Sequence, residues 1–233
     1  MNSETGNNPQ IPMNPIIKST IRNSLTLGLF SVLTVGLISL TYILTRDRIS
    51  EQVRSYEAKV LIEILPDTTY DNILLDSMIT LQPSRLLSTS GEKKAFVALK
   101  QNQPIAVILP AVAPNGYNGR IELLVGINRD GTLAGVRVVT HKETPGLGDK
   151  IDTKITNWVL DFDGKSLENI EAHGWAVQKD GGQFDQFTGA TITPRAVVAA
   201  VYKALKYFEV HQKELLDKDL MTQNWIQDSK HDQ

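Results

Sequence analysis

The segment best suited to chemistry is a run of small and hydroxyl-bearing residues ahead of a predicted helix. Asp185-Gln-Phe-Thr-Gly-Ala-Thr191 is followed by Thr193 and Pro194, which we expect to be the N-cap and first residue of that helix. The free N–H groups and positive dipole at a helix N-terminus favour an anion such as a phosphate. The small residues before Thr191 allow a large reagent to reach its hydroxyl. On local chemistry alone, a helix-capping turn with spare threonines is the simpler interpretation.

A second segment, Thr140-His-Lys-Glu-Thr-Pro-Gly-Leu-Gly-Asp149, directly follows a predicted strand. Gly146 and Gly148 permit positive φ angles and leave backbone N–H groups open to a ligand, while Pro145 stiffens the segment. Such a loop can hold a flat or anionic ligand and lay the Leu147 side chain against it. An ordinary turn rich in glycine is the alternative. The spacing matches neither a P-loop nor a dinucleotide-binding fingerprint.

The composition excludes several classes of site. The chain has 233 residues, no cysteine and a formal charge of -2. Without cysteine there is no disulfide, thiolate metal site or cysteine nucleophile, and the absence of thiols suits an oxidising compartment. The charge balance disfavours a nucleic-acid partner. The four histidines, at positions 141, 173, 211 and 231, show no metal-ligand spacing, so we expect no metal site. The sequence also has no nucleophile-elbow or kinase signature, and we expect no catalytic side chain.

An uncharged apolar run from Ser24 to Leu44 is long enough to cross a membrane. As a helix its 21 residues extend about 31 Å, against a hydrocarbon core of ~30 Å. A cleaved signal peptide is disfavoured because the run lacks a small-residue cleavage site and continues into a charged helix. Basic residues flank both ends, so the positive-inside rule leaves the orientation undecided. We predict a single transmembrane helix.

The remaining pattern predicts one α+β domain with an antiparallel sheet and flanking helices. Helical spacing continues from the membrane run to about Leu65, and residues 67–90 mix a short helix with loops. Expected strands cover 94–100, 105–109, 121–127 and 133–138, and an amphipathic helix covers 194–214. The predicted divisions are a tail (1–23), a transmembrane helix (24–44), a helical connector (45–90), the folded domain (91–214) and a C-terminal tail (215–233).

The two segments together carry a family resemblance. Asp185 to Thr191 resembles the Asp-x-x-(Ser/Thr)-Gly-Ala-(Thr/Ser) signature of FMN-binding domains, in which the FMN phosphate is joined to the last hydroxyl. The loop from His141 to Gly148 and the stretch Gly116-Tyr-Asn-Gly119 recur in the same family. With one N-terminal membrane helix, the chain resembles the G-subunit family of Rnf (Rsx) ion-translocating electron-transport complexes. The C subunit of the sodium-translocating NADH:quinone reductase is the nearest alternative, but is usually longer before its flavin domain.

This resemblance implies particular site residues. Thr191 would carry FMN covalently, and Asp185, Thr188, Gly189 and Ala190 would form the surface that a flavin transferase recognises while transferring FMN from FAD. Glu143, Thr144, Leu147 and Gly148 would line the isoalloxazine ring, with Lys179 nearby.

The resemblance also implies an electron-carrying subunit rather than a free-standing enzyme. Its partners would be the other membrane subunits of the complex, and its flavin domain would lie on the periplasmic side of the inner membrane. Two other functions stay open from the sequence. One is a membrane-tethered module that binds a ligand non-covalently, and the other is a protein that only scaffolds its complex.

Overall fold

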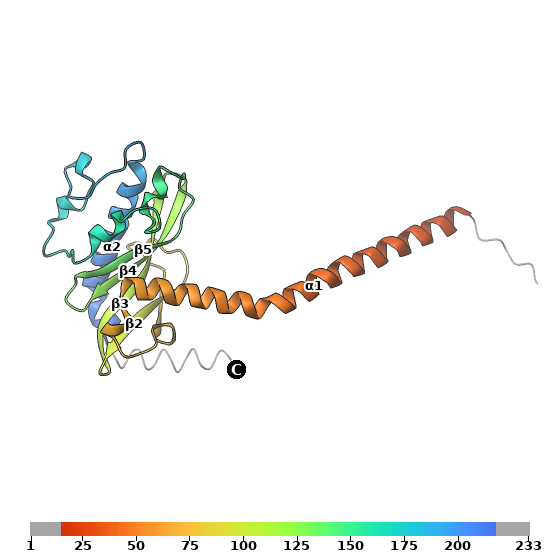
Figure 1. The fold of residues 1–233 in the computed structure, drawn as a ribbon, viewed down its shortest axis with the longest axis horizontal. Helices are drawn as coiled ribbons and strands as arrows, with labels where there is room; N and C mark the ends of the chain where they lie inside the picture. Colours follow the sequence, from red (N-terminus) through yellow and green to blue (C-terminus); the bar gives the residue numbers. More distant parts are fainter. Residues whose placement is uncertain (1–14, 218–233) are drawn as a thin grey trace, which may run out of the picture. The chain divides into compact units, whose positions relative to one another are not determined.

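The structure is a computed structural model that describes residues 15–217 (Figure 1). Its longer elements are α1 (Pro15–Ile64), β1 (Met78–Leu81), β2 (Lys93–Lys100), β3 (Gln103–Gly116), β4 (Gly119–Asn128), β5 (Leu133–Thr140) and α2 (Ile192–Leu215). Short 3-10 helices cover Asp67–Thr69, Leu74–Asp76, Gly148–Ile151, Trp158–Phe162, Ala172–Gly174 and Gln178–Asp180. The chain packs as two compact units that divide within α1, between Ser55 and Tyr56.

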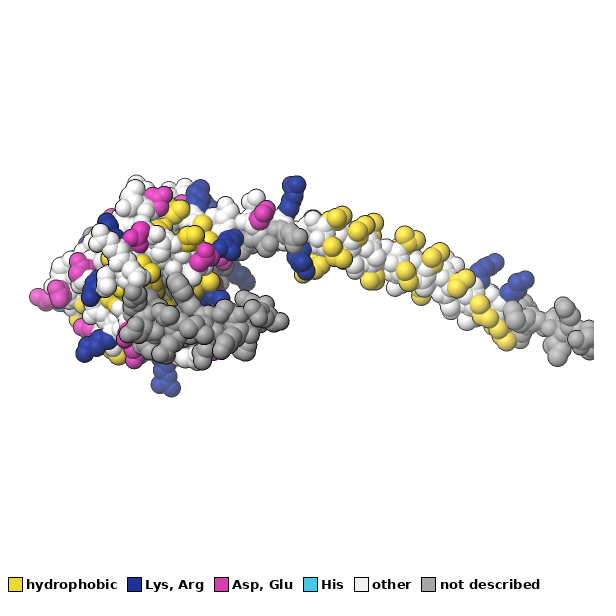
Figure 2. Space-filling model, turned by 90° about the horizontal axis from the view of Figure 1, so that it is seen from below, with side chains coloured by type: hydrophobic (Ala, Val, Ile, Leu, Met, Phe, Trp, Pro, Cys, Tyr) yellow, Lys and Arg dark blue, Asp and Glu magenta, His cyan; other side chains and the backbone are white. Residues whose placement is uncertain are grey.

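The first unit is the N-terminal part of α1. The segment Ile16–Arg46 is long and apolar enough to cross a membrane, and none of it is buried within the protein. Figure 2 shows hydrophobic side chains along this helix between basic side chains at its two ends. Five threonines on this segment donate their hydroxyls to the carbonyl four residues earlier, for example Thr34 to Phe30 at 3.0 Å. These polar groups are therefore satisfied within the helix, as a hydrocarbon environment requires.

The second unit is built on a five-stranded antiparallel sheet in the order β1-β2-β3-β4-β5. Each strand pairs with the next along the chain, so tight turns connect most neighbours. Gln101 and Asn102 adopt positive φ angles of 49° and 62° between β2 and β3, and Gly131 adopts 85° between β4 and β5. The predicted hairpins at these positions are confirmed, as is the α+β fold with an antiparallel sheet.

The two faces of the sheet are both covered. Along β3, Val107 and Leu109 belong to the core cluster that includes α2, whereas Ala106 and Ile108 belong to a cluster with Leu61 of α1. Because successive side chains of a strand point to opposite faces, α2 covers one face and the last turns of α1 cover the other. The C-terminal end of α1 is therefore part of the folded domain.

The end of α1 packs against a pair of glycines in the sheet. Gly126 of β4 lies opposite Gly135 of β5 in the sheet. A Cβ atom added at Gly126 would overlap Cγ2 of Ile64, and one at Gly135 would lie 3.1 Å from the Ile64 carbonyl oxygen. Ile64 is only 1% exposed. The missing side chains thus create the space in which the last residue of α1 packs against the sheet.

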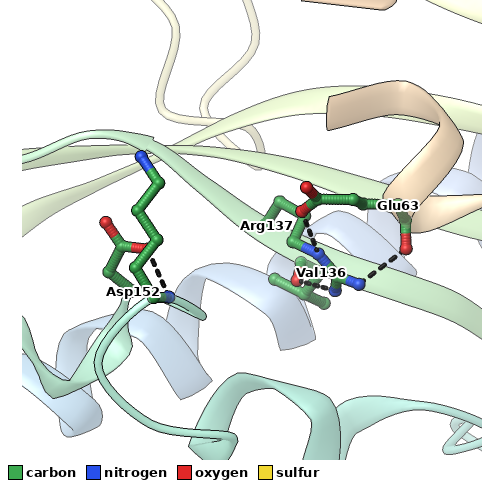
Figure 3. A network of polar contacts seen from close by, with 5 residues as sticks. Glu63, Val136, Arg137 and Asp152 are labelled. Atoms are coloured by element: carbon green, nitrogen blue, oxygen red, sulfur yellow. Dashed lines mark hydrogen bonds and ion pairs between the residues drawn. The ribbon is translucent and has the colours of Figure 1, made fainter. Parts of the chain in front are cut away.

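Arg137 of β5 joins the same helix end (Figure 3). Its Nη2 donates to the carbonyl oxygen of Glu63 at 2.6 Å, and its Nη1 donates to the carbonyl oxygen of the preceding residue, Val136, at 2.8 Å. The carbonyls of the last turn lack partners within a helix and carry its negative dipole end, so a guanidinium is well suited to this position.

Two expectations about the connector and the sheet need correction. Residues 67–90, expected to mix a short helix with loops, contain 3-10 turns and also β1, which pairs with β2. Strand β3 also continues past residue 109 to Gly116, despite Pro110 and Pro114. Its pairing with β2 ends at Ile108, so beyond that point the prolines interrupt no ladder with β2. The proposed domain boundaries remain predictions.

Candidate functional site

The segment before α2 forms an exposed turn. The N–H of Ala190 donates to the carbonyl of Phe187 at 3.1 Å, and Gly189 adopts a φ of 82° within this turn. Such a φ favours glycine, because a Cβ atom is strained there. Thr188 and Gly189 are exposed and Ala190 is half-buried. The small residues that precede Thr191 therefore lie at the surface.

Thr191 directly precedes the last helix, α2. The structure places the N-cap at Thr191, two residues earlier than the sequence predicts, and the Thr191 hydroxyl makes no capping hydrogen bond. The predicted N-cap, Thr193, is wrong because its hydroxyl is bonded elsewhere and its side chain is fully buried. Pro194 is tolerated inside the first turn, where N–H groups have no partner within the helix. The Thr191 hydroxyl is left beside the positive end of α2.

The loop after β5 lies against this turn. The N–H groups of Leu147 and Gly148 both donate to the carbonyl of Thr144 at 3.1 Å, and Gly146 adopts a φ of 77°. Leu147 is 43% exposed. A Cβ atom added at Gly189 would lie 3.6 Å from Cδ2 of Leu147. The fold thus brings together the two segments that the sequence singled out, although about forty residues separate them.

Glu143 is buried where three segments of the chain meet. Its side chain is only 5% exposed. Its Oε1 accepts the Asn118 N–H at 3.0 Å, and its Oε2 accepts the Thr193 hydroxyl. We call Glu143, Asn118 and Thr193 the Glu143 cluster. It joins the turn between β3 and β4, the loop after β5 and the first turn of α2.

The other predicted residues lie around these segments. Asp185 is exposed, and its carbonyl accepts the indole N–H of Trp158 at 2.9 Å. Lys179 is also exposed, and its N–H donates to the side chain of Gln186 at 3.1 Å. The structure gives the Lys179 side chain no defined role at the site.

An exposed ion pair connects the region of Lys179 to α2. The Arg195 guanidinium donates two hydrogen bonds to Asp180, at 2.6 and 2.9 Å. These hydrogen bonds, and the charges of Arg195 and Lys179, lower the pKa of Asp180 from its ordinary 3.8. The pair holds the 178–180 turn against the beginning of α2.

Sequence reasoning missed Asn118 and Thr193 as parts of the site. Asn118 belongs to the recurring Gly-Tyr-Asn-Gly stretch, and its side chain also donates to the hydroxyl of Thr144 at 2.9 Å. The exposed apolar side chains of Tyr117 and Ile192 were missed as well, at 66% and 45% exposure. Among the described residues, no group of three or more acidic or histidine side chains is placed to hold a metal ion.

Comparisons with known proteins agree with this arrangement. Residues 116–206 match the FMN-binding domain family, and residues 13–64 match the RnfG N-terminal region. The G subunit of the ion-translocating oxidoreductase complex of Pseudomonas aeruginosa UCBPP-PA14 is 52% identical over 199 residues, covering 85% of this chain and 93% of its own. Its namesake from Vibrio cholerae O395 is 48% identical over 194 residues, covering 83% and 92%.

Among solved structures, NqrC of Shewanella oneidensis matches with a TM-score of 0.43 and 23% identity, covering 62% of this chain and 74% of its own. The relatives from Pseudomonas and Vibrio decide the family, because their matches cover 85% and 83% of this chain at about half identity. The chain belongs to the family of G subunits of ion-translocating oxidoreductase complexes, and it contains that family's FMN-binding domain.

Proposed function

We propose that this chain carries electrons within a membrane complex through one FMN, held by a phosphoester to Oγ1 of Thr191. The single observation that carries the proposal is the state of Thr191 at the start of α2. Thr191 is the N-cap residue, its hydroxyl makes no capping hydrogen bond, and it follows a turn of small residues at the surface. A phosphodiester keeps one negative charge, which the N-terminal end of α2 stabilises.

The residues around Thr191 fit an FMN. Gly189 and Ala190 leave room for the phosphate, and the apolar side chains of Leu147 and Ile192 are exposed near Thr191, although large apolar side chains are usually buried. In this proposal Thr144, Leu147 and Gly148 line the isoalloxazine ring. Lys179 lies close to it as an exposed cation.

Attachment requires a group-transfer step that this chain does not catalyse by itself. A flavin transferase would use FAD: the Thr191 oxygen bonds to the FMN phosphorus, the phosphoanhydride bond breaks, and AMP leaves. The hydroxyl proton passes to a base of the transferase. Asp185, Thr188, Gly189 and Ala190 form the acceptor surface, and the hydrogen bond from Trp158 to the Asp185 carbonyl supports its shape.

When bound, FMN supplies one- and two-electron redox chemistry. This chain's own residues bind the cofactor, orient it and shield one side of it. In this proposal no side chain of the site transfers a proton to or from the flavin. The ester prevents loss of the cofactor during repeated electron transfer, and α1 keeps the flavin close to its redox partners.

The proposed location follows from α1. The segment Ile16–Arg46 would cross the inner membrane, with the FMN-binding domain on the periplasmic side, beside the other subunits of the complex. Protease added to intact spheroplasts should then digest the domain, with a cytoplasmic protein of the same cells as the protected control. Full protection of the domain would contradict this orientation.

The attachment is tested on a denaturing gel. Membranes from cells with an active flavin transferase should give a fluorescent band at the position of this chain. Thr191→Ala should abolish the fluorescence, whereas Thr68→Ala, at an exposed threonine outside the site, should retain it. A dark native band would contradict covalent attachment. Loss in Thr188→Ala with retention in Thr191→Ala would move the ester to Thr188.

A further inference from the structure

Both oxygens of the Glu143 carboxylate accept hydrogen bonds from other segments of the chain. One oxygen accepts a backbone N–H from Asn118 and the other accepts the hydroxyl of Thr193, and the side chain is 5% exposed. We propose that Glu143 is a positioning residue, which fixes the helix end next to Thr191 and places a negative charge against Gly148, a residue proposed to line the flavin, rather than a direct ligand of the flavin. This inference rests on the proposed function.

The space around the carboxylate supports this role. A Cβ atom added at Gly116 would lie 2.9 Å from Oε1 of Glu143, and one added at Gly148 would lie 2.7 Å from Oε2. The Cβ atom added at Gly148 would also lie 2.9 Å from the hydroxyl oxygen of Thr193. Two glycines from different segments therefore leave the space that the carboxylate fills, and a side chain at either position would displace it.

The hydrogen bonds of the Glu143 cluster fix the acceptor residue. Thr193 lies in the first turn of α2, two residues after Thr191, so holding its hydroxyl also sets the position of the Thr191 backbone. Removing one partner of a buried hydrogen bond leaves the other unpaired, which is costly. The attachment reaction depends on how the acceptor oxygen is oriented, and small displacements slow such reactions strongly.

The charge of Glu143 has a separate effect. Among the described residues, no ion pair within 4.0 Å includes Glu143, so hydrogen bonds alone compensate its charge. In a buried setting the field of such a charge is weakly screened. A negative charge close to a flavin opposes the addition of electrons and lowers its reduction potential.

Two substitutions separate these effects. Glu143→Gln retains the volume and both hydrogen bonds, because its amide oxygen can face Asn118 while its NH₂ donates to the Thr193 oxygen. It removes only the charge. Thr193→Val retains the charge and leaves Oε2 without its donor. Glu209→Gln, at an exposed residue in the C-terminal half of α2, is the matched control.

The readouts are the rate of FMN attachment with purified transferase and FAD, the unfolding temperature, and the reduction potential of the attached flavin. We expect Glu143→Gln to keep the attachment rate within about twofold of native and to shift the potential to a more positive value. We expect Thr193→Val to slow attachment roughly ten- to hundredfold and to lower the unfolding temperature. Glu209→Gln, which removes an exposed ion pair to Lys206, should leave the attachment rate and the potential unchanged and should lower the unfolding temperature less than Thr193→Val does.

An unchanged potential in Glu143→Gln would overturn the role of the charge. An unchanged attachment rate and unfolding temperature in Thr193→Val would overturn the positioning role, and would favour Glu143 as a direct flavin ligand. If the native chain accepts no FMN at all, the proposed function fails. The unfolding temperature of Thr193→Val still decides whether the Glu143 cluster holds the three segments together.

Discussion

The Thr193 hydroxyl donates a hydrogen bond to Oε2 of Glu143, a residue 50 positions earlier in the chain. The other carboxylate oxygen accepts the N–H of Asn118, in the turn between β3 and β4. Three segments that are distant in sequence therefore meet at one buried carboxylate. This contact orients the beginning of α2, where the proposed FMN acceptor Thr191 lies.

The turn before Thr191 depends on glycine at position 189. Gly189→Ala places a Cβ atom on a residue with a φ of 82°, against Leu147. The strain costs about 1–2 kcal/mol, which lowers the unfolding temperature by roughly 2–4 °C per kcal/mol. We also expect slower FMN attachment, because the turn must shift. Calorimetry and a flavin-attachment time course measure the two effects.

Gly131→Ala is the control for this prediction. Gly131 has a φ of 85° in the turn between β4 and β5, with no atom within 4 Å of the added Cβ. It should lower the unfolding temperature by a similar amount and leave attachment unchanged. Equal slowing of attachment in both variants would show that strain anywhere in the domain is sufficient, and would contradict a local role for Gly189.

Local patterns in the sequence were sufficient to predict much of this fold. Alternating apolar residues indicated four of the five strands, and helical spacing indicated α2 and the long N-terminal helix. Strand β1 was missed because Met78–Leu81 is only four residues long and alternates too briefly to be distinguished from a loop. Its place at the edge of the sheet depends on pairing with β2, which no local pattern reveals.

The site was predicted less completely than the fold. Composition and motif spacing identified the two segments and Thr191, but the N-cap was placed on Thr193 because a Thr-Pro pair is typical of a helix start. The Thr193 hydroxyl instead donates to Glu143, which lies in another segment. The two side chains meet only in the folded chain. Asn118 was missed for the same reason, since its backbone N–H rather than its side chain contacts Glu143.

The end of α1 should be sensitive to the size of residue 126. Gly126→Ala would bring its Cβ into overlap with Cγ2 of Ile64, and overpacking of this kind costs about 1–3 kcal/mol. Gly91→Ala, with no atom within 4 Å of its added Cβ, should be nearly neutral. The free energy of unfolding in urea measures both effects.

A double variant tests whether Ile64 is the cause. Ile64→Ala alone should cost about 2–5 kcal/mol, because it leaves a cavity in a buried site. Combined with Gly126→Ala, the loss should be smaller than the sum of the two single losses, since the overlap is removed. Strictly additive losses would mean that α1 does not pack against Gly126.

Arg137 should matter more than an exposed arginine. Arg137→Met removes donors to the Glu63 and Val136 carbonyls from a side chain that is 11% exposed. We expect a loss of about 1.5–3 kcal/mol in the free energy of unfolding. Arg120→Met, at an ion pair whose arginine is 61% exposed, should lose at most about 1 kcal/mol. Equal losses would contradict the role of Arg137 at the end of α1.

The Asp180–Arg195 ion pair should give a small stabilisation that depends on pH. The pKa of Asp180 is lowered in the folded chain from its ordinary 3.8, so the unfolded chain binds a proton more readily. The stabilisation is therefore fully present above pH 3.8 and is lost as the pH falls through the lowered pKa. The difference in unfolding temperature between the native chain and Asp180→Asn should shrink in that range. A difference that does not change with pH would contradict this.

The central claim concerns one hydroxyl group, and a peptide mass tests it most directly. Trypsin cleaves after Lys179 and Arg195, so Thr191 is released on one peptide together with Thr188 and Thr193. From chain purified out of membranes with an active flavin transferase, this peptide should carry the mass of FMN less one water, and fragmentation should locate it on Thr191. An unmodified peptide, or FMN on another residue of it, would contradict the account.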